Sequence, residues 1–511
     1  MMSRVLSCAT LGIDAYVVRI ETDLDYQLPA FSVVGLPDNA VKESRDRVTA
    51  AIKNSGRIFP NRRVTVNLAP ADIRKEGSAF DLPIAVGILA ASGDISPEIL
   101  SQYIVLGELA LDGAVRPVRG VLPMAVETRQ AGYKGMILPR ENAREAAIAG
   151  GIDVHPVGDL METLDFLEGY RDVPSLEVDI DRIFSQALSY RIDFRDVRGQ
   201  VHAKRALEVA ASGGHNIIMI GPPGSGKTML TRRLPTILPD LTLDEAIEAT
   251  KIHSVAGLLP PDTTLVAIRP FRSPHHTISD AGLIGGGPHP RPGEVSLAHH
   301  GVLFLDELPE FKKHVLEVLR QPLEDGFVTI ARAMVSLTYP AQFMLACALN
   351  PCPCGYFGDP KNECTCSPPI IQRYMSRISG PLLDRIDIHI EVPGVDYNEL
   401  TDEPGGETSD AIREGVNAAR KVQLHRFREK QHLFCNAHMG PAEIRDYCKI
   451  DGKGEELLKM AITKLGLSAR AYDRILKVSR TIADLEEEQE IKPQHVGEAI
   501  QYRSLDRNLW M

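Results

Sequence analysis

The chain has 511 residues, of which 44% are hydrophobic and 24% charged, and its formal net charge is −11. These values are typical of a soluble globular protein of roughly three domains. The acidic balance excludes a globally basic nucleic-acid surface, but a ring can line its pore with Lys and Arg while its outside stays acidic.

The sequence carries no sign of membrane insertion or secretion. No run of about 18 apolar residues is present, so no transmembrane helix is expected. The first residues lack the continuous apolar core of a signal peptide. The eight cysteines are few for this length, which is typical of a reducing compartment. We therefore expect a cytoplasmic protein.

Composition and periodicity divide the chain into three blocks joined by two linkers, at 1–168, 169–193 (linker), 194–395, 396–410 (linker) and 411–511. In the first block, Val64–Leu68 is a predicted strand and Asp81–Ser92 a predicted buried helix. The linkers are rich in charge, Pro, Ser and Gly. The second block reads as strand–loop–helix units of an α/β domain, and the third as all-helical.

A phosphate-binding loop follows the apolar run at 217–220. The sequence GPPGSGKT matches GxxxxGK[ST] between a predicted strand and a predicted helix, which is the context that the motif requires. Its glycines let backbone N–H groups surround phosphate, and the helix N-terminus adds partial positive charge. The nucleotide-binding residues predicted here are Gly221, Pro222, Pro223, Gly224, Ser225, Gly226, Lys227 and Thr228. We expect Lys227 to reach the β and γ phosphates and the Thr228 hydroxyl to bind Mg²⁺.

Two later apolar runs end in polar side chains. VLFL is followed by Asp306 and Glu307, and FMLACAL by Asn350. At the carboxyl edge of a parallel sheet, Asp306 is suited to hold Mg²⁺ and Glu307 to activate the attacking water. Asn350 is suited to contact the γ-phosphate or that water. The order of the three motifs predicts ATP hydrolysis.

Four cysteines cluster directly after Asn350, with the spacing C-x-C-x₉-C-x-C. They are Cys352, Cys354, Cys364 and Cys366. Four thiolates can close a tetrahedral Zn²⁺ site, although C-x-C is tighter than the usual C-x₂-C. Reduced thiols in a loop and a redox-sensitive pair are the open alternatives.

The order of the motifs resembles that of AAA+ ATPases, and longer stretches resemble their magnesium-chelatase-like branch. These stretches are RPFRSPHHTISDAGLIGGG, PRPGEVSLAHHGVLFLDELPEF, LNPCPCGY and SGPLLDRIDIHIEV. The nearest resemblance is to the bacterial YifB/ComM group, and it covers essentially the whole chain. It implies an α/β P-loop NTPase core with a C-terminal helical lid, working with ATP and Mg²⁺ in a homo-oligomeric ring, expected to be a hexamer.

The resemblance also assigns arginines. The Arg of LLDRID, here Arg385, is implied to reach the nucleotide of the next subunit and stabilise charge on the γ-phosphoryl, worth about 10³ in rate. A structural surface cluster is the alternative. The run SARAYDRILK resembles the second nucleotide sensor, which we place at Arg470. Arg474, one helical turn on, is the other candidate.

Two insertions of this branch are implied to face the ring pore. One is Ser279–Arg291. The other is Gly326–Pro340, whose alternation predicts a hairpin with Arg332 at its tip. Arg332 is a candidate for contact with DNA phosphate, and a plain hairpin with an exposed Arg is equally open.

The first block resembles the proteolytic domain of Lon, which is ribosomal-S5-like and α+β. Lon uses a Ser–Lys dyad. Alignment places Ala79 at the nucleophile, with Ser78 one position off, and Leu122 near the lysine, so we expect no peptidase activity. The basic residues of this block are either a substrate-contacting surface or a solvated face: Lys42, Arg45, Arg47, Arg57, Arg62 and Arg63.

Three functions fit the ATPase. The first is a DNA helicase or translocase acting on single-stranded or branched DNA, as in branch migration during natural transformation or recombination. The second is a chelatase-like insertion chaperone, which needs partner subunits with an integrin-like domain that this chain lacks. The third is a protein-remodelling ATPase. We expect the first, with no membrane partner.

Overall fold

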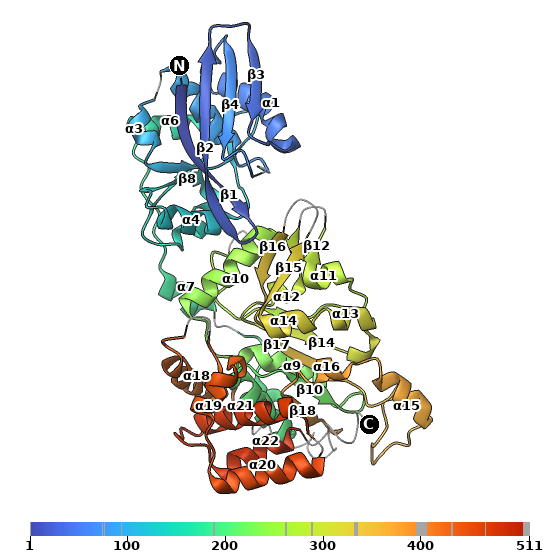
Figure 1. The fold of residues 1–511 in the computed structure, drawn as a ribbon. Coiled ribbons are helices and arrows are strands. Elements are labelled where there is room, and N and C mark those ends of the chain that lie inside the picture. The colour runs from blue at the N-terminus through green and yellow to red at the C-terminus, as the bar shows by residue number, and fades with distance from the viewer. Residues whose placement is uncertain are drawn as a thin grey trace. The chain divides into compact units, whose positions relative to one another are not determined.

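A computed structural model describes residues 2–73, 75, 77–93, 95–187, 190–260, 263–287, 290–331, 336–394, 406–430, 433–465 and 467–503 (Figure 1). The chain forms two compact units, which we name unit 1 (residues 1–187 and 243–267) and unit 2 (residues 188–242 and 268–511). Residues 243–267 thus belong to unit 1 although they interrupt the sequence of unit 2. Among the described helices, none is both long and apolar enough to cross a membrane.

Unit 1 is built on a mixed seven-stranded sheet of order β3-β4-β2-β1-β5-β8-β9. Its strands are β1 (Met2–Leu11), β2 (Asp14–Asp25), β3 (Ala30–Val34), β4 (Arg63–Ala69), β5 (Tyr103–Val105), β8 (Gly135–Pro139) and β9 (Asp153–Val157), with β6 (Glu108–Leu109) and β7 (Val115–Arg116) as a separate pair. The expected strand at 64–68 lies in β4. Its inward residues are buried and alternate with partly exposed ones, as expected of a strand with one face on the core.

The helices of unit 1 are α1 (Asn39–Asn54), α2 (Asp81–Ser92), α3 (Pro97–Leu100), α4 (Val121–Gln130), α5 (Arg140–Ala147), α6 (Leu160–Leu167), α7 (Ile180–Ala187) and α10 (Leu243–Ala256). Helix α2 has the predicted bounds and is buried along nearly its whole length, because its sequence is apolar all round. Helix α10 is fixed to the rest of unit 1 by the Ser254 hydroxyl, whose Oγ lies 2.5 Å from Oε1 of Glu145.

The stretch expected as the first linker is partly structured. Leu176 N donates to Val154 O (2.9 Å) and Val173 is buried, so the beginning of this stretch extends the edge of β9. Helix α7 then forms over Ile180–Ala187. The sequence pattern missed both, because edge pairing is a tertiary contact and an eight-residue helix is too short for a clear period.

Unit 2 is built on a parallel five-stranded sheet of order β11-β14-β17-β10-β18. The strands are β11 (Phe271–Arg272), β14 (Val302–Leu305), β17 (Met344–Leu349), β10 (Ile217–Ile220) and β18 (Ile388–Glu391). Strands β10, β14 and β17 are buried at every position. Such continuous apolar runs are what a parallel strand covered on both faces requires.

Around this sheet the chain forms short helices and two small hairpins. The helices are η1 (Phe194–Asp196), α8 (Val201–Gly213), α9 (Lys227–Arg233), η2 (Leu234–Thr236), α11 (Asp280–Ile284), α12 (Glu294–Leu297), η3 (Leu308–Glu310), α13 (Lys313–Glu317), α14 (Arg320–Asp325), α15 (Pro368–Met375) and α16 (Gly380–Leu383). The hairpins are β12 (Gly285–Gly286) with β13 (Arg291–Pro292), and β15 (Phe327–Ala331) with β16 (Ser336–Pro340). The predicted hairpin at 326–340 is therefore confirmed, while its tip with Arg332 lies outside the described residues.

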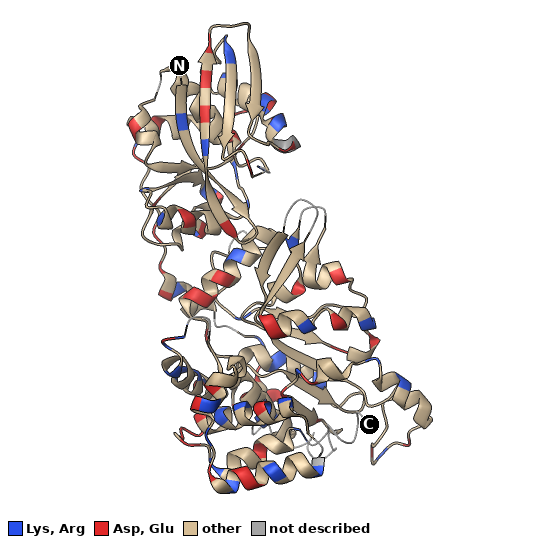
Figure 2. Cartoon of the chain, viewed as in Figure 1, with Lys and Arg blue, Asp and Glu red and all other residues tan. Residues whose placement is uncertain are grey.

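The C-terminal segment is helical: α18 (Ser409–Arg426), η4 (Asn436–His438), α19 (Pro441–Tyr447), α20 (Gly452–Leu465), α21 (Ala469–Leu485) and α22 (Pro493–Gln501). It shares one hydrophobic core with the sheet, since Val416 and Ile482 belong to the same cluster as Ile217 and Ile388. Helix α18 starts inside the second expected linker, most of which lies outside the described residues. Acidic and basic residues intermingle along these helices (Figure 2).

Candidate active site

The phosphate loop links β10 to α9. A Cβ built on Gly221 would lie 2.1 Å from the carbonyl oxygen of Val392, so only glycine fits this close approach to the chain after β18. Gly224 and Gly226 have φ of +77° and +87°, in the left-handed region that glycine tolerates. The Gln200 side chain braces the loop by donating to the carbonyl of Ser225 (2.5 Å). These contacts hold the loop in a tightly wrapped conformation.

Lys227 begins α9 and its ammonium is turned back over the loop. Its Nζ donates to the carbonyls of Gly221 and Pro222 (2.8 Å each) and to Oδ1 of Asn350 (3.2 Å). Burial lowers the pKa of Lys227 to about 8, although the Asp306 carboxylate opposes that shift. An ammonium surrounded by oxygen acceptors, in a largely buried position, is suited to bind phosphate oxygens.

Thr228 and Asp306 face one another across the site. The Thr228 hydroxyl donates to Oδ2 of Asp306 (2.8 Å), while Oδ1 of Asp306 accepts from the backbone N–H of Glu307 (3.0 Å). A hydroxyl and a carboxylate side by side are the hard oxygen donors that Mg²⁺ prefers beside nucleotide phosphates. The donor set therefore fits a Mg²⁺–nucleotide complex.

Glu307 sits in a strained turn directly after β14. Its φ is +53°, which is uncommon for a residue other than glycine, and 60% of its side chain is exposed. Nδ1 of His276 lies 3.9 Å from Oε2 of Glu307. Strain of this kind clusters at functional sites. His276 lies within the stretch RPFRSPHHTISDAGLIGGG, but the sequence alone assigned this histidine no role.

These groups meet because β14, β17 and β10 are neighbours and parallel. The residues after the carboxyl ends of such strands lie along one edge of the sheet, where ligands of α/β sheets bind. The structure accordingly brings together Lys227, Thr228, Asp306 and Asn350, with Glu307 beside them.

Arg385 lies at the opposite edge of the sheet. It precedes β18, which runs parallel to β10 with Ile388 beside Ile217, whereas the phosphate loop follows the far end of β10. The four residues of β10 span roughly 13 Å at about 3.3 Å per residue. Arg385 therefore cannot reach the nucleotide site of its own subunit.

The Arg385 side chain is nearly buried and lies near two other arginines, Arg320 and Arg470. It is 7% exposed and pairs with Glu324, and its Nη1 donates to the carbonyl of Pro381 (2.5 Å). Burial lowers the pKa of Arg385, and the positive charges of Arg320 and Arg470 lower it further, against the opposing charge of Glu324.

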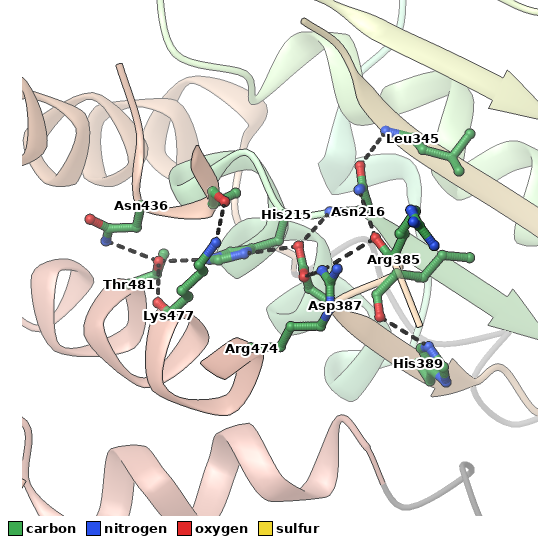
Figure 3. Close-up of polar contacts among 12 residues, drawn as sticks. His215, Asn216, Leu345, Arg385, Asp387, His389, Asn436, Arg474, Lys477 and Thr481 are labelled. Carbon is green, nitrogen blue, oxygen red and sulfur yellow. Dashed lines mark hydrogen bonds and ion pairs between the residues drawn. The ribbon is translucent and has the colours of Figure 1, made fainter. Parts of the chain in front are cut away.

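Both candidate second-sensor arginines lie on α21 at this same edge. Arg474 pairs with Asp387 and donates to the carbonyl of Arg385 (3.3 Å) (Figure 3). Its guanidinium is therefore already bound to groups of its own subunit. Arg470 is 62% exposed and lies 3.5 Å from Asp384. Of the two, Arg470 is the one accessible to a ligand.

A buried polar cluster that no sequence motif predicts links α21 to the residues before β10 and β18 (Figure 3). Oδ2 of Asp387 accepts from Nδ1 of His215 (3.3 Å), and Nε2 of His215 lies 2.8 Å from the Thr481 hydroxyl. Asn216 donates to the carbonyl of Arg385 (2.9 Å). Burial alone would raise the pKa of Asp387, but the charges of Arg474 and His215 outweigh burial and hold it well below its usual range.

The sulfur atoms of the four clustered cysteines converge. The sulfur of Cys352 lies 3.3 Å from that of Cys354 and 3.7 Å from that of Cys364, and the sulfurs of Cys354 and Cys364 are 3.6 Å apart. All four sulfur atoms lie within 4.8 Å of one another. Four thiolates around Zn²⁺, with Zn–S of about 2.3 Å, would be separated by about 3.8 Å, whereas a disulfide needs about 2.05 Å. The four thiols therefore fit a thiophilic metal ion.

Comparison with known proteins assigns the chain to a family. Models described as magnesium chelatase subunit ChlI match residues 193–400 and 20–142, and a model of its C-terminal part matches residues 406–503. The competence protein ComM of Haemophilus influenzae is 45% identical over 509 residues, which is 99% of this chain and 98% of ComM. The chain belongs to the ComM/YifB family of magnesium-chelatase-like AAA+ proteins. The YifB protein of Escherichia coli K12, itself described as uncharacterized, is 43% identical over 99% of this chain and 98% of its own length.

Membership in the ComM/YifB family makes the chain a AAA+ ATPase and implies ATP and Mg²⁺ as its ligands. A more distant match, to Lon protease 2 of Bacillus subtilis, is 32% identical over 169 residues, covering 30% of this chain and 29% of that protein.

Proposed function

We propose that the chain is one subunit of an ATP-hydrolysing ring, expected to be hexameric, that moves along single-stranded or branched DNA and promotes branch migration in recombination or natural transformation. The observation that carries the proposal is the convergence of Lys227, Thr228, Asp306 and Asn350 at one sheet edge, with Arg385 at the other. A nucleotide site and an arginine on opposite edges are what a motor needs when its subunits complete one another's sites.

In this proposal each residue of the site has a separate task. Lys227 and the loop N–H groups bind the phosphates. Mg²⁺, when bound beside Thr228 and Asp306, neutralises charge on the phosphates. Glu307 accepts the proton of the attacking water, and its exposed carboxylate is free to approach that water. Asn350 hydrogen-bonds the γ-phosphate or the water from the end of β17.

The neighbouring subunit supplies the remaining charge. Arg385 and Arg470 occupy one edge of the sheet, where burial first, and then repulsion from Arg320 and Arg470, lowers the pKa of Arg385. The γ-phosphoryl of an adjacent subunit is an anion that would relieve this repulsion. Arg385 must exchange Glu324 for that anion, so the ion pair inside the subunit keeps the arginine in place until a neighbour docks.

Two observations support DNA as the substrate. The most similar relatives include a competence protein. In addition, the two insertions pack on each other: Tyr339 donates its hydroxyl hydrogen to the carbonyl of Pro290 (2.9 Å), and a Cβ on Gly285 would lie 2.7 Å from Cδ1 of Ile330. The described hairpin strands carry one charge, Arg291, which is exposed. In our proposal Arg291 and Arg332 contact the phosphate backbone.

We propose no peptidase role for unit 1. The alignment puts Ala79 and Leu122 at the dyad positions, and Leu122 is fully buried. The neighbouring Ser78 hydroxyl bonds the Glu108 carboxylate, not a lysine. Two of the basic residues considered for substrate contact are engaged within the unit: Arg47 pairs with the buried Asp81 (2.7 Å) and Arg57 with Glu168 (3.1 Å).

Zn²⁺ is the metal that we propose for the cluster of Cys352, Cys354, Cys364 and Cys366, because four thiolates in a compact loop form a closed structural zinc site. Zinc analysis of purified protein tests this, with one ion per chain expected.

The function is tested by steady-state ATP hydrolysis, alone and with single-stranded, duplex and four-way-junction DNA. We expect DNA to stimulate turnover, most strongly when branched or single-stranded. Stimulation should fall steeply with salt, because counterions compete for the phosphate contacts. A rate that no DNA changes, from protein that still assembles with ATP, would contradict the DNA motor and favour a protein-directed ATPase.

A further inference from the structure

The four-cysteine loop packs against the phosphate loop. A Cβ built on Gly355 would lie 2.4 Å from Cδ and 2.5 Å from Cγ of Pro223. Gly355 has φ of +88°, so its backbone conformation and the lack of a side chain both favour this approach. Pro223 is the third residue of the phosphate loop. The loop that carries the thiols therefore packs directly on the phosphate loop.

Gly355 is fixed by the same turn that presents the thiols. Its N–H donates to the carbonyl of Cys352 (3.0 Å), and Cys354 is its chain neighbour. Cys352 is fully buried at the end of β17, whereas Cys364 reaches the cluster from the far side of the loop, 3.6 Å from Cys354 sulfur to sulfur. An ion shared by these thiolates would close the turn on Gly355.

We propose that the metal-bound cysteine loop sets the affinity of the phosphate loop for ATP. The inference rests on the zinc site proposed above. Bound metal holds Gly355 against Pro223 and so keeps the loop in its phosphate-binding shape, whereas loss of the metal frees the turn and lets the loop open. The ATPase thereby depends on a thiophilic divalent cation that takes no part in the chemistry.

The first experiment measures zinc content and ATP affinity on the same full-length protein. Zinc is removed with 1,10-phenanthroline, the chelator is dialysed away, and binding of a fluorescent ATP analogue is measured with Mg²⁺ restored. We expect the Kd for the analogue to rise about tenfold, the equivalent of about 1.4 kcal/mol, and to recover when Zn²⁺ is returned. Circular dichroism checks that the protein stays folded.

A matched pair of glycines separates the contact from the general stability of the loop. Gly355 and Gly358 both lie between Cys354 and Cys364 and both have positive φ, +88° and +82°, but a Cβ on Gly358 meets nothing within 4 Å. Gly355→Ala and Gly358→Ala therefore add similar backbone strain, and only the first presses on Pro223. We expect Gly355→Ala to weaken ATP binding about tenfold while retaining zinc, and Gly358→Ala to bind ATP like the parent.

The outcomes distinguish the two proposals. Protein without zinc contradicts the metal site itself. Protein with zinc, whose ATP affinity changes neither on chelation nor in Gly355→Ala, contradicts the coupling and leaves the zinc site standing. Equal weakening in both glycine variants also overturns the coupling, because loop strain alone then accounts for the effect.

Discussion

The two ends of strand β10 carry polar clusters of opposite kinds. At the sheet edge where β10 ends, Glu307, which follows β14, is exposed and strained. The Lys227 ammonium is held there by loop carbonyls that phosphate oxygens can replace. At the amino end of β10, His215 and Asp387 are buried. Arg474, on α21, pairs with Asp387. In our proposal a ligand completes the first cluster, whereas the protein itself completes the second. Strand β10 would then join a catalytic edge of the sheet to a structural edge.

Arg474 and Arg385 are close together in space but differ in the same way. Arg474 completes the buried cluster, whereas Arg385 stands beside it with a partner, Glu324, whose own side chain is 53% exposed. An ion pair with an exposed partner is worth little, roughly 0–1 kcal/mol, and is readily exchanged. A pair like Arg474–Asp387, buried on one side and supported by His215, is costly to break.

The largest expected effect lies at the catalytic edge. Glu307→Gln removes the proton acceptor and preserves shape, so we expect turnover to fall about 10²–10⁴-fold while ATP remains bound. Glu310→Gln, in the short helix η3 that directly follows Glu307 and paired with Arg377, is the control and should keep near-parental turnover. Normal hydrolysis by Glu307→Gln would show that another group activates the water.

Arg385→Ala should lower turnover by about 10³ and leave ATP binding intact, because Arg385 is remote from the site in its own subunit. Subunits with Lys227→Ala should fail to bind ATP but keep Arg385. Mixing the two inactive proteins is expected to restore part of the ATPase rate, since some interfaces then combine a working loop with a working arginine. Absence of rescue in mixed assemblies would argue against shared sites. Arg445→Ala is the control for the loss of one positive charge, because Arg445 lies on the exposed face of α19.

Asp387→Asn tests the structural edge. It leaves the half-buried Arg474 without its counter-charge, and we expect the free energy of unfolding to fall by about 3 kcal/mol, seen as a lower Tm. Because the pKa of Asp387 in the folded protein lies below its ordinary value of 3.8, its contribution is present above that value and is lost as pH falls below it. Asp410→Asn, whose carboxylate is 76% exposed beside Arg413, should leave the Tm nearly unchanged.

The smallest effect is a pH dependence of nucleotide binding. Lys227 has a pKa of about 8, and phosphate binds its charged form and so raises that pKa. ATP affinity should therefore be full below pH 8 and fall up to about tenfold per pH unit above it. Titration calorimetry in two buffers of different ionisation enthalpy should detect proton uptake at pH 8.5. In Lys227→Arg the uptake should vanish, because guanidinium stays charged.

Local sequence determined much of the catalytic edge. Each of its groups directly follows or begins an element with a clear pattern: Lys227 after a glycine-rich loop, Asp306 after VLFL, Asn350 after MLACAL. In a parallel sheet the carboxyl ends of strands share one edge whatever the strand order, so motif and strand together predict that such residues meet. Strand β4, helix α2 and the β15–β16 hairpin were predictable for the same reason, because hydrophobic periodicity is local.

Tertiary structure alone decided the rest. The sequence provides no reason for His215, Asp387 and Thr481 to meet, since they lie in three segments of the chain up to 266 residues apart and each resembles an ordinary core or surface residue by itself. Nor does spacing reveal that Gly355 touches Pro223, that Arg474 is taken up by Asp387, or that residues 243–267 join unit 1. These outcomes depend on strand order and on the packing of helices against the sheet, whereas a motif records only the chemistry of residues adjacent in the chain.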